Sequence, residues 1–121
     1  MLADWLEALP RTARVLDLGA GAALIERAVL ARGRDDLRWT ALDGSLDCMQ
    51  PLRRYSQAAA IVDLEQLSVL PGGFDAVVAG DVLEHLAHPE QFLVLIQRAL
   101  RPGRASSGRR GSGLRGVDCR R

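Results

Sequence analysis

Lysine and asparagine are absent from this chain of 121 residues, and isoleucine, phenylalanine and tyrosine are scarce. These five amino acids have AT-rich codons, whereas alanine, arginine, glycine and leucine are abundant. The bias indicates a GC-rich genome, and we expect a bacterial source.

The chain also has little cysteine and no long hydrophobic run. Its two cysteines, Cys48 and Cys119, are too few and too far apart for a disulfide framework or a metal cluster. We therefore expect free thiols in a reducing cytoplasm. No stretch approaches the ~20 apolar residues that span a membrane, and the N-terminus does not have the pattern of a signal peptide. We expect no contact with a membrane.

Charge divides the chain into two parts. Residues 1–103 carry ten arginines and fourteen acidic residues, whereas residues 104–121 carry six arginines and one aspartate. The second part is rich in Arg, Gly and Ser and cannot bury enough apolar surface to offset the entropy lost on ordering. We expect a small domain over residues 1–103 and a disordered tail over 104–121. Such a tail can contact nucleic acid, but we favour a solvated segment and expect no nucleic-acid partner.

Within the domain, predicted strands alternate with predicted helices. Short apolar runs that end at turn residues predict strands at 14–18, 38–42, 58–62 and 74–79. Apolar residues on one helical face predict helices at 2–9, 22–31, 46–55 and 89–100. This alternation predicts an α/β fold, with a parallel sheet, right-handed crossovers and helices on both faces.

Local details of three helices follow from the same patterns. We expect Ile25, Ala28 and Val29 to face the sheet from the helix at 22–31. Ser45 is placed to cap the helix at 46–55, and Pro51 should kink or split that helix. The last helix should pack onto the sheet through the apolar stripe that contains Ile96.

The first predicted strand ends in an acidic residue and a glycine turn, Asp17-Leu18-Gly19-Ala20-Gly21. Glycine has no Cβ, so the backbone can turn sharply and a ligand can approach it closely. The helix that follows presents unpaired N–H groups toward the same place. Asp43 and Asp63 end the second and third strands, and carboxyl ends of parallel strands bind ligands in α/β sheets. This pattern predicts a site for a nucleotide-type cofactor.

Six segments between residues 14 and 103 share their order and spacing with a known family. The first three are Val15-Leu16-Asp17-Leu18-Gly19-Ala20-Gly21, Ala41-Leu42-Asp43-Gly44-Ser45 and Val62-Asp63-Leu64. The others are Phe74-Asp75-Ala76-Val77-Val78, Asp81-Val82-Leu83-Glu84-His85-Leu86 and Leu100-Arg101-Pro102-Gly103. Together they resemble the motifs of class I S-adenosylmethionine-dependent methyltransferases, especially the small-molecule branch. The resemblance implies a Rossmann-like α/β fold and S-adenosyl-L-methionine as methyl donor.

The resemblance also implies roles for individual residues in cofactor binding. Asp17 would help to hold the ammonium end of the cofactor, which the backbone carbonyl of Gly80 would also meet. Gly19 and Gly21 would let the backbone approach the adenosine and methionine portions.

Asp43, Asp63 and Leu64 complete the expected cofactor site. A carboxylate at Asp43 suits hydrogen bonds from both ribose hydroxyls, and one at Asp63 suits the adenine amino group. Leu64 would then pack on the adenine ring. Either aspartate can instead serve as a turn residue or a helix cap.

No catalytic residue follows from the sequence. Glu84 and His85 could act as acid and base, but we expect them to orient the loop or to pack beneath the cofactor. His85 and His88 have no third ligand nearby in the sequence, so we expect no metal site.

A dinucleotide-binding oxidoreductase is the nearest alternative. Its glycine fingerprint, counted from Gly19, requires Gly or Ala at position 24. Leu24 stands there and would hinder close packing of the helix against the strand. We therefore favour the methyltransferase.

The C-terminal part departs from the family pattern. Members usually continue from Pro-Gly-Gly into a fifth strand, whereas Arg104 and the polar tail follow Pro102-Gly103 here. We expect the C-terminal half of the sheet to be missing, strand four to present an exposed apolar edge, and the tail to come from a frame shift or truncated gene. The function is then either in-line methyl transfer to a small-molecule acceptor, helped by proximity and orientation, or cofactor binding by an inactive remnant. The acceptor and the oligomeric state do not follow from the sequence.

Overall fold

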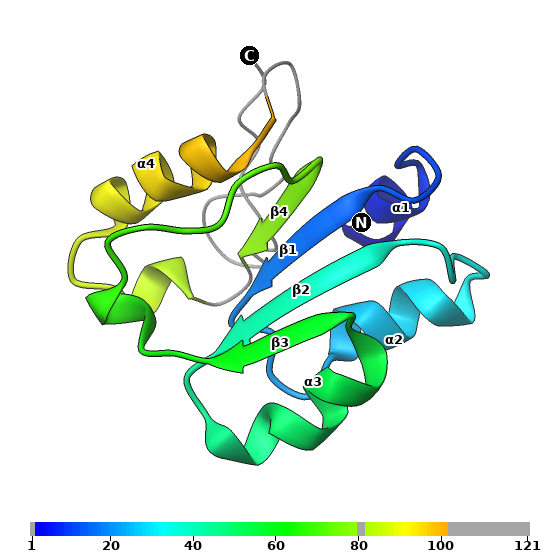
Figure 1. Cartoon of the computed structure of the whole chain (residues 1–121), viewed down its shortest axis with the longest axis horizontal. Helices are drawn as coiled ribbons and strands as arrows, with labels where there is room; N and C mark the ends of the chain where they lie inside the picture. The colour runs from blue at the N-terminus through cyan, green and yellow to red at the C-terminus, as the bar shows by residue number, and fades with distance from the viewer. Residues whose placement is uncertain (1, 80–81, 102–121) are drawn as a thin grey trace.

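The computed structural model describes residues 2–79 and 82–101 (Figure 1). The predicted tail at 104–121 and Gly80 lie outside the described residues. The helices are α1 (Leu2–Glu7), α2 (Leu24–Ala31), α3 (Met49–Tyr55) and α4 (Pro89–Ala99), and the strands are β1 (Arg14–Leu18), β2 (Arg38–Asp43), β3 (Ala58–Ile61) and β4 (Ala76–Ala79). Three short 3₁₀ turns are η1 (Leu46–Cys48), η2 (Leu64–Gln66) and η3 (Leu83–His85). None of the described helices has the length and apolar character that crossing a membrane requires.

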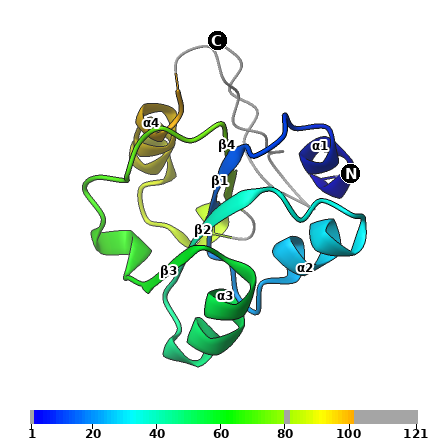
Figure 2. The ribbon, with the colours of Figure 1, turned by 45° about the vertical axis from the view of Figure 1, so that its right-hand side comes forward.

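The four strands form one parallel sheet in the order β3-β2-β1-β4. Leu18 at the end of β1 lies opposite Leu42 on one side and Ala79 on the other, so the strands end at one common edge. Helices α1, α2 and α3 cover one face of the sheet and α4 covers the other (Figure 2). The predicted Rossmann-like α/β fold is confirmed.

Alternating side chains of β1 divide the core into two layers. Leu16 and Leu18 pack with Ile96 of α4, whereas Val15 packs on the opposite face with Val29 of α2. All five side chains are fully buried. Because successive residues of a strand point to opposite faces, this short apolar run supplies both layers.

The side chains of strand β4 are buried. Each of its four residues is no more than 1% exposed, since Val77 and Ala79 face the α4 layer and Ala76 and Val78 face the other. β4 is the end strand of the described sheet, as predicted, but its apolar side chains are not exposed. They point toward the covered faces of the sheet and not along its edge.

Helix α2 differs from the prediction at its start and on its inner face. It begins at Leu24, two residues late, because Ala23 has a left-handed conformation with φ of 62°. Val29 is buried as predicted, but Ala28 is exposed and Glu26 is buried in its place. Glu26 precedes Val29 by three residues and so shares its face. A pattern of apolar residues at helical spacing does not predict a glutamate on the buried face of the helix.

Pro51 splits the third predicted helix, as expected. Proline has no N–H to donate to the carbonyl four residues earlier, and the segment divides into η1 and α3. Ser45 makes no side-chain capping bond, so that prediction is wrong. Instead, the backbone N–H of Ser45 donates a hydrogen bond to Oδ1 of Asp43 at 2.9 Å.

Candidate functional site

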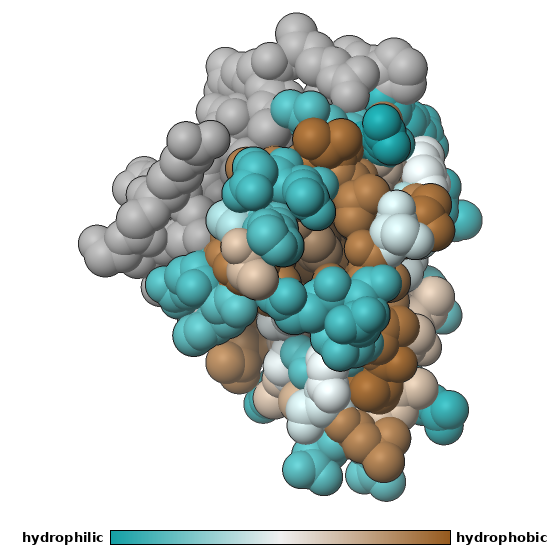
Figure 3. All heavy atoms as spheres, turned by 90° about the vertical axis from the view of Figure 1, so that its left-hand side faces the viewer, coloured by the Kyte–Doolittle hydropathy of each residue, from teal (hydrophilic) through white to brown (hydrophobic). Residues whose placement is uncertain are grey.

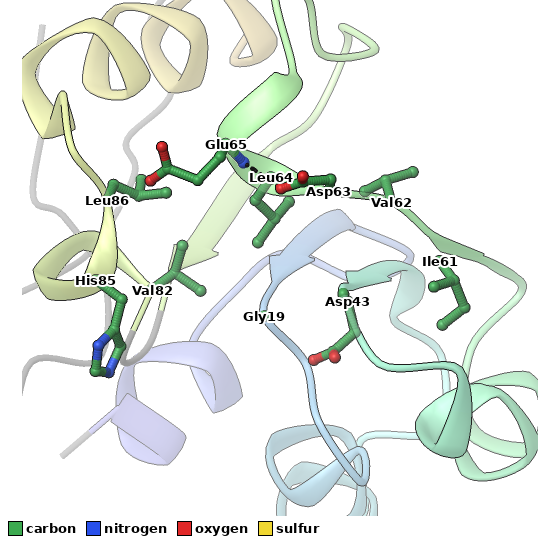
Figure 4. Close-up of a pocket in the computed structure, with 11 residues that line it drawn as sticks. Gly19, Asp43, Ile61, Val62, Asp63, Leu64, Glu65, Val82, His85 and Leu86 are labelled. Atoms are coloured by element: carbon green, nitrogen blue, oxygen red, sulfur yellow. Dashed lines mark hydrogen bonds between the residues drawn. The ribbon is translucent and has the colours of Figure 1, made fainter.

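A cavity of about 520 Å³ lies at the edge where the four strands end (Figure 4). Its lining comes from the ends of the strands and the segments that follow them: Gly19 after β1, Asp43 and Gly44 at the end of β2, residues 61–65 from the end of β3 onward, and Val82, His85 and Leu86 after β4. Figure 3 views this side of the molecule and shows hydrophilic residues across its middle, with hydrophobic residues beside them. Within the part of the chain that the structure describes, the lining includes three carboxylates and one histidine but no arginine.

The glycine turn after β1 has the geometry that the sequence predicts. Gly19 and Gly21 have φ values of 70° and 58°, in the left-handed region that favours glycine. A Cβ on Gly19 would lie 2.0 Å from Cγ2 of Val82, so a side chain does not fit there. A Cβ on Gly21 would meet nothing within 4 Å, so only its backbone conformation requires glycine.

Asp43 ties two loops together. Its Oδ2 accepts a hydrogen bond from the N–H of Gly21 at 2.6 Å, and its Oδ1 accepts one from Ser45 at 2.9 Å. The carboxylate thus joins the loop after β1 to the loop after β2. Each carboxylate oxygen has a second lone pair, so Asp43 keeps acceptor capacity toward the cavity that it lines.

Asp63 acts as a cap, which is one of the two roles that the sequence allows. Its Oδ1 accepts a hydrogen bond from the N–H of Glu65 at 3.0 Å at the start of η2. Asp63 and Leu64 both line the cavity, so the structure brings them together with Gly19 and Asp43.

Asp17 lies beneath the glycine turn and does not belong to the cavity lining. Its side chain shares the layer between the sheet and α2 with Glu26, and each residue is only 2% exposed. No donor among the described residues reaches Oδ2 of Asp17 or either carboxylate oxygen of Glu26. Burial, and then the neighbouring Glu26 carboxyl, raise the pKa of Asp17 well above its ordinary value. Burial also raises the pKa of Glu26.

Glu26 is one of the residues at or near this site that the sequence does not single out, as are Glu65 and Val82 of the cavity lining. The available signal was an acidic residue three positions before Val29, on the buried face of an amphipathic helix. Two adjacent buried carboxyls cannot both ionise without a large cost. Burial therefore favours a protonated carboxyl in this pair, which lies behind the glycine turn.

The histidines form no metal site among the described residues. His85 lines the cavity, and its Nε2 lies 3.8 Å from Oε1 of Glu84. His88 lies outside the cavity lining, with Nδ1 3.8 Å from Oε1 of Glu90. No three His, Cys, Asp or Glu residues gather closely enough in the described ranges to hold a metal ion.

Comparison with known proteins identifies the family. Residues 16–103 match the family described as methyltransferase domain. The chain belongs to this family. Every residue that lines the cavity falls within the matched range, so this methyltransferase domain contributes the whole described site.

Two curated relatives are O-methyltransferases. The malonyl-[acyl-carrier protein] O-methyltransferase of Chlorobium phaeovibrioides is 31% identical over 101 residues, which are 78% of this chain and 38% of that protein. The ubiquinone biosynthesis O-methyltransferase of Xanthomonas campestris is 34% identical over 98 residues, 75% of this chain and 40% of that protein. The chain thus spans less than half the length of either relative.

Solved structures show the same fold. A methyltransferase of Haloferax volcanii, solved in complex with the Trm112 methyltransferase activator, is 26% identical with a TM-score of 0.69, over 87% of this chain and 48% of that one. A TehB-like S-adenosylmethionine-dependent methyltransferase of Corynebacterium glutamicum has a TM-score of 0.71 at 23% identity, over 88% and 61% of the two chains. The resemblance to class I methyltransferases is confirmed for family and fold.

Proposed function

We propose that the cavity binds S-adenosyl-L-methionine and that the protein transfers the methyl group to a small-molecule acceptor. The observation that carries the proposal is the convergence of the glycine turn, Asp43 and Asp63 on one cavity at the carboxyl ends of β1, β2 and β3. Ligands of open α/β sheets bind at this edge. The names of the curated relatives favour an oxygen atom as the methyl acceptor.

The lining suits the charge and shape of this cofactor. Three carboxylates, at Asp43, Asp63 and Glu65, line the cavity, and its described lining residues include one histidine, His85, but no arginine. A site of one charge sign attracts a ligand of the opposite sign, and the sulfonium and ammonium groups of the cofactor are positive. We assign the remaining acceptor capacity of Asp43 to the ribose hydroxyls, that of Asp63 to the adenine amino group, and Leu64 to the adenine ring.

The other predicted residues have less direct roles. Gly19 and Gly21 let the backbone come close to the cofactor, because neither carries a side chain. The contact of Asp17 with the ammonium end stays a prediction, because its carboxyl is buried outside the described lining and burial favours its uncharged form. The role of the Gly80 carbonyl stays a prediction.

The bound cofactor would supply a methyl group activated by a positively charged sulfur. The residues of this chain would bind and orient that group, and proximity and alignment with the acceptor would provide most of the rate acceleration. The structure assigns no general base. We place the reaction in a bacterial cytoplasm, in keeping with the bias in amino-acid composition and the free thiol of Cys48.

Calorimetry with S-adenosylhomocysteine, the demethylated product, tests the proposal. Asp43→Asn keeps one carbonyl oxygen but loses the charge, and we expect it to weaken binding by about 1–3 kcal/mol. Asp47→Asn is the matched control, because Asp47 is exposed in η1 and does not line the cavity. Binding of NADH with no response to S-adenosylhomocysteine would overturn the assignment. Binding of S-adenosylmethionine without turnover over a panel of acceptors would favour a binding module.

A further inference from the structure

One wall of the cavity separates it from a second, smaller cavity. Leu64, Glu65 and Leu86 line both the 520 Å³ cavity and a neighbouring space of about 60 Å³ that extends to Phe92 of α4. We name these three residues the η2–η3 wall; Leu86 follows Glu65 by 21 positions in the sequence. The position of the wall sets the shape of the larger cavity on this side.

A single side chain joins the two halves of this wall. Oε1 of Glu65 accepts a hydrogen bond from the backbone N–H of Ala87 at 2.9 Å. Among the described residues, no other hydrogen bond connects η2 with the segment from Val82 to His88. Figure 4 shows the Glu65 side chain extending toward Leu86.

The Glu65 side chain is itself held in place at its base. Its own N–H donates to Oδ1 of Asp63, which fixes the start of η2. Glu65 therefore connects the end of β3 with the loop after η3, much as Asp43 connects the loops after β1 and β2. The difference is that Asp43 is bound at both oxygens, whereas the link to Ala87 is one exposed hydrogen bond.

We propose that Glu65 is a positioning residue for the adenine end of the cofactor. Its bond to Ala87 holds Leu64 and Leu86 together as one apolar surface against which the ring packs. Without the bond, η2 and the loop after η3 can separate and the two cavities can merge. The inference rests on the proposed function, because it takes the adenine end as the ligand of this wall.

Three variants separate the reach of the side chain from its charge. Glu65→Gln keeps an oxygen at the same reach but loses the charge. Glu65→Asp keeps the charge but is shorter by one methylene, and Glu65→Ala loses both. Glu90→Ala is the control, because Glu90 is an exposed carboxylate at the start of α4 that lines neither cavity.

The measured quantities are the Kd values of the full chain for S-adenosylhomocysteine and for adenosine, and the hydrogen exchange rate of the Ala87 amide without ligand. We expect Glu65→Asp and Glu65→Ala to raise both Kd values by about 5- to 10-fold, as loss of one charge-assisted hydrogen bond at a partly exposed site would do. Glu65→Gln should stay within about 2-fold of wild type, since a neutral acceptor retains most of the bond. Ala87 exchange should accelerate in the Asp and Ala variants alone.

Each alternative result has a distinct meaning. If Glu65→Gln binds the two ligands as weakly as Glu65→Ala does, while Glu65→Asp binds them like wild type, the carboxylate acts through its charge. The positioning role is then overturned. Normal binding by Glu65→Asp and Glu65→Ala overturns it as well. If wild type binds neither ligand, the proposed function fails, and this inference fails with it.

Discussion

At the scale of single residues, the buried pair of Asp17 and Glu26 is the least expected feature. Both pKa values are raised from their ordinary values of 3.8 and 4.5, chiefly because burial disfavours the charged forms. The folded state therefore holds a proton that the unfolded state releases above about pH 4. The stabilising contribution of the pair is fully present below the unfolded pKa values and is lost as the pH rises toward the folded ones.

Glu26→Gln tests this linkage. The amide cannot ionise and can donate a hydrogen bond to the Asp17 carboxylate. We expect the wild-type free energy of unfolding to fall as the pH rises from 5 to 8, by up to about 1.4 kcal/mol per pH unit, and the variant to show a shallower slope. Urea denaturation over this pH range provides the measurement.

Glu90→Gln is the control for Glu26→Gln, since it alters an exposed carboxylate and should leave the wild-type slope unchanged. Parallel pH profiles for wild type and Glu26→Gln would show that Glu26 does not contribute to the proton held in the folded state.

At the scale of structural elements, the glycine turn depends on a contact with Val82, the residue before η3, as well as on its own backbone. The N–H groups of Gly19 and Ala20 both donate to the carbonyl of Leu42, at 2.7 and 3.1 Å, which anchors the turn to the end of β2. Val82 then covers Gly19 from the other side. Both positions require glycine for their left-handed backbone, and Gly19 requires it also because Val82 leaves no room for a side chain.

Alanine substitutions should separate the cost of the backbone conformation from the cost of the overlap with Val82. Gly21→Ala should cost about 1–2 kcal/mol, the penalty for a left-handed conformation with a Cβ. Gly19→Ala should cost more, because its Cβ also overlaps Val82. The double variant Gly19→Ala, Val82→Ala should recover part of that difference in urea denaturation. Equal losses at the two glycines, with no recovery, would rule out the Val82 contact as the cause.

At the scale of the whole molecule, stability comes from two apolar layers on either side of one sheet. Helix α4 provides most of the cover on its face, through Phe92, Ile96 and Ala99, which are at most 4% exposed. The opposite face depends on α1, α2 and α3. The α4 layer therefore supports β1 and β4, the strands that carry the glycine turn and the loop with Val82.

Ile96→Ala tests the contribution of the α4 layer. Removing a fully buried side chain should reduce the free energy of unfolding by about 2–5 kcal/mol. Val94→Ala on the same helix is the matched control, because Val94 is 44% exposed, and it should change stability by no more than about 0.5 kcal/mol. Similar effects at the two positions in denaturant unfolding would contradict the packing of α4 onto the sheet.

The sequence by itself determined the α/β class, the parallel sheet and the glycine turn, because these follow from short-range patterns. Apolar runs, helical stripes and turn residues each depend on neighbours within one element. The structure confirms these points. It also brings Gly19, Asp43, Asp63 and Leu64 to one cavity, while their roles toward a cofactor stay predictions.

Only the tertiary structure decided how the site is held together. The burial of Glu26 beside Asp17, the contact of Val82 with Gly19, and the Glu65 bond to Ala87 join residues that lie far apart along the chain. The pattern around Glu26 predicted alanine on the buried face, and Ser45 stands at the predicted N-cap position without making a side-chain capping bond. Such contacts depend on which elements pack against each other, and the helix or strand propensities of a single segment do not determine that packing.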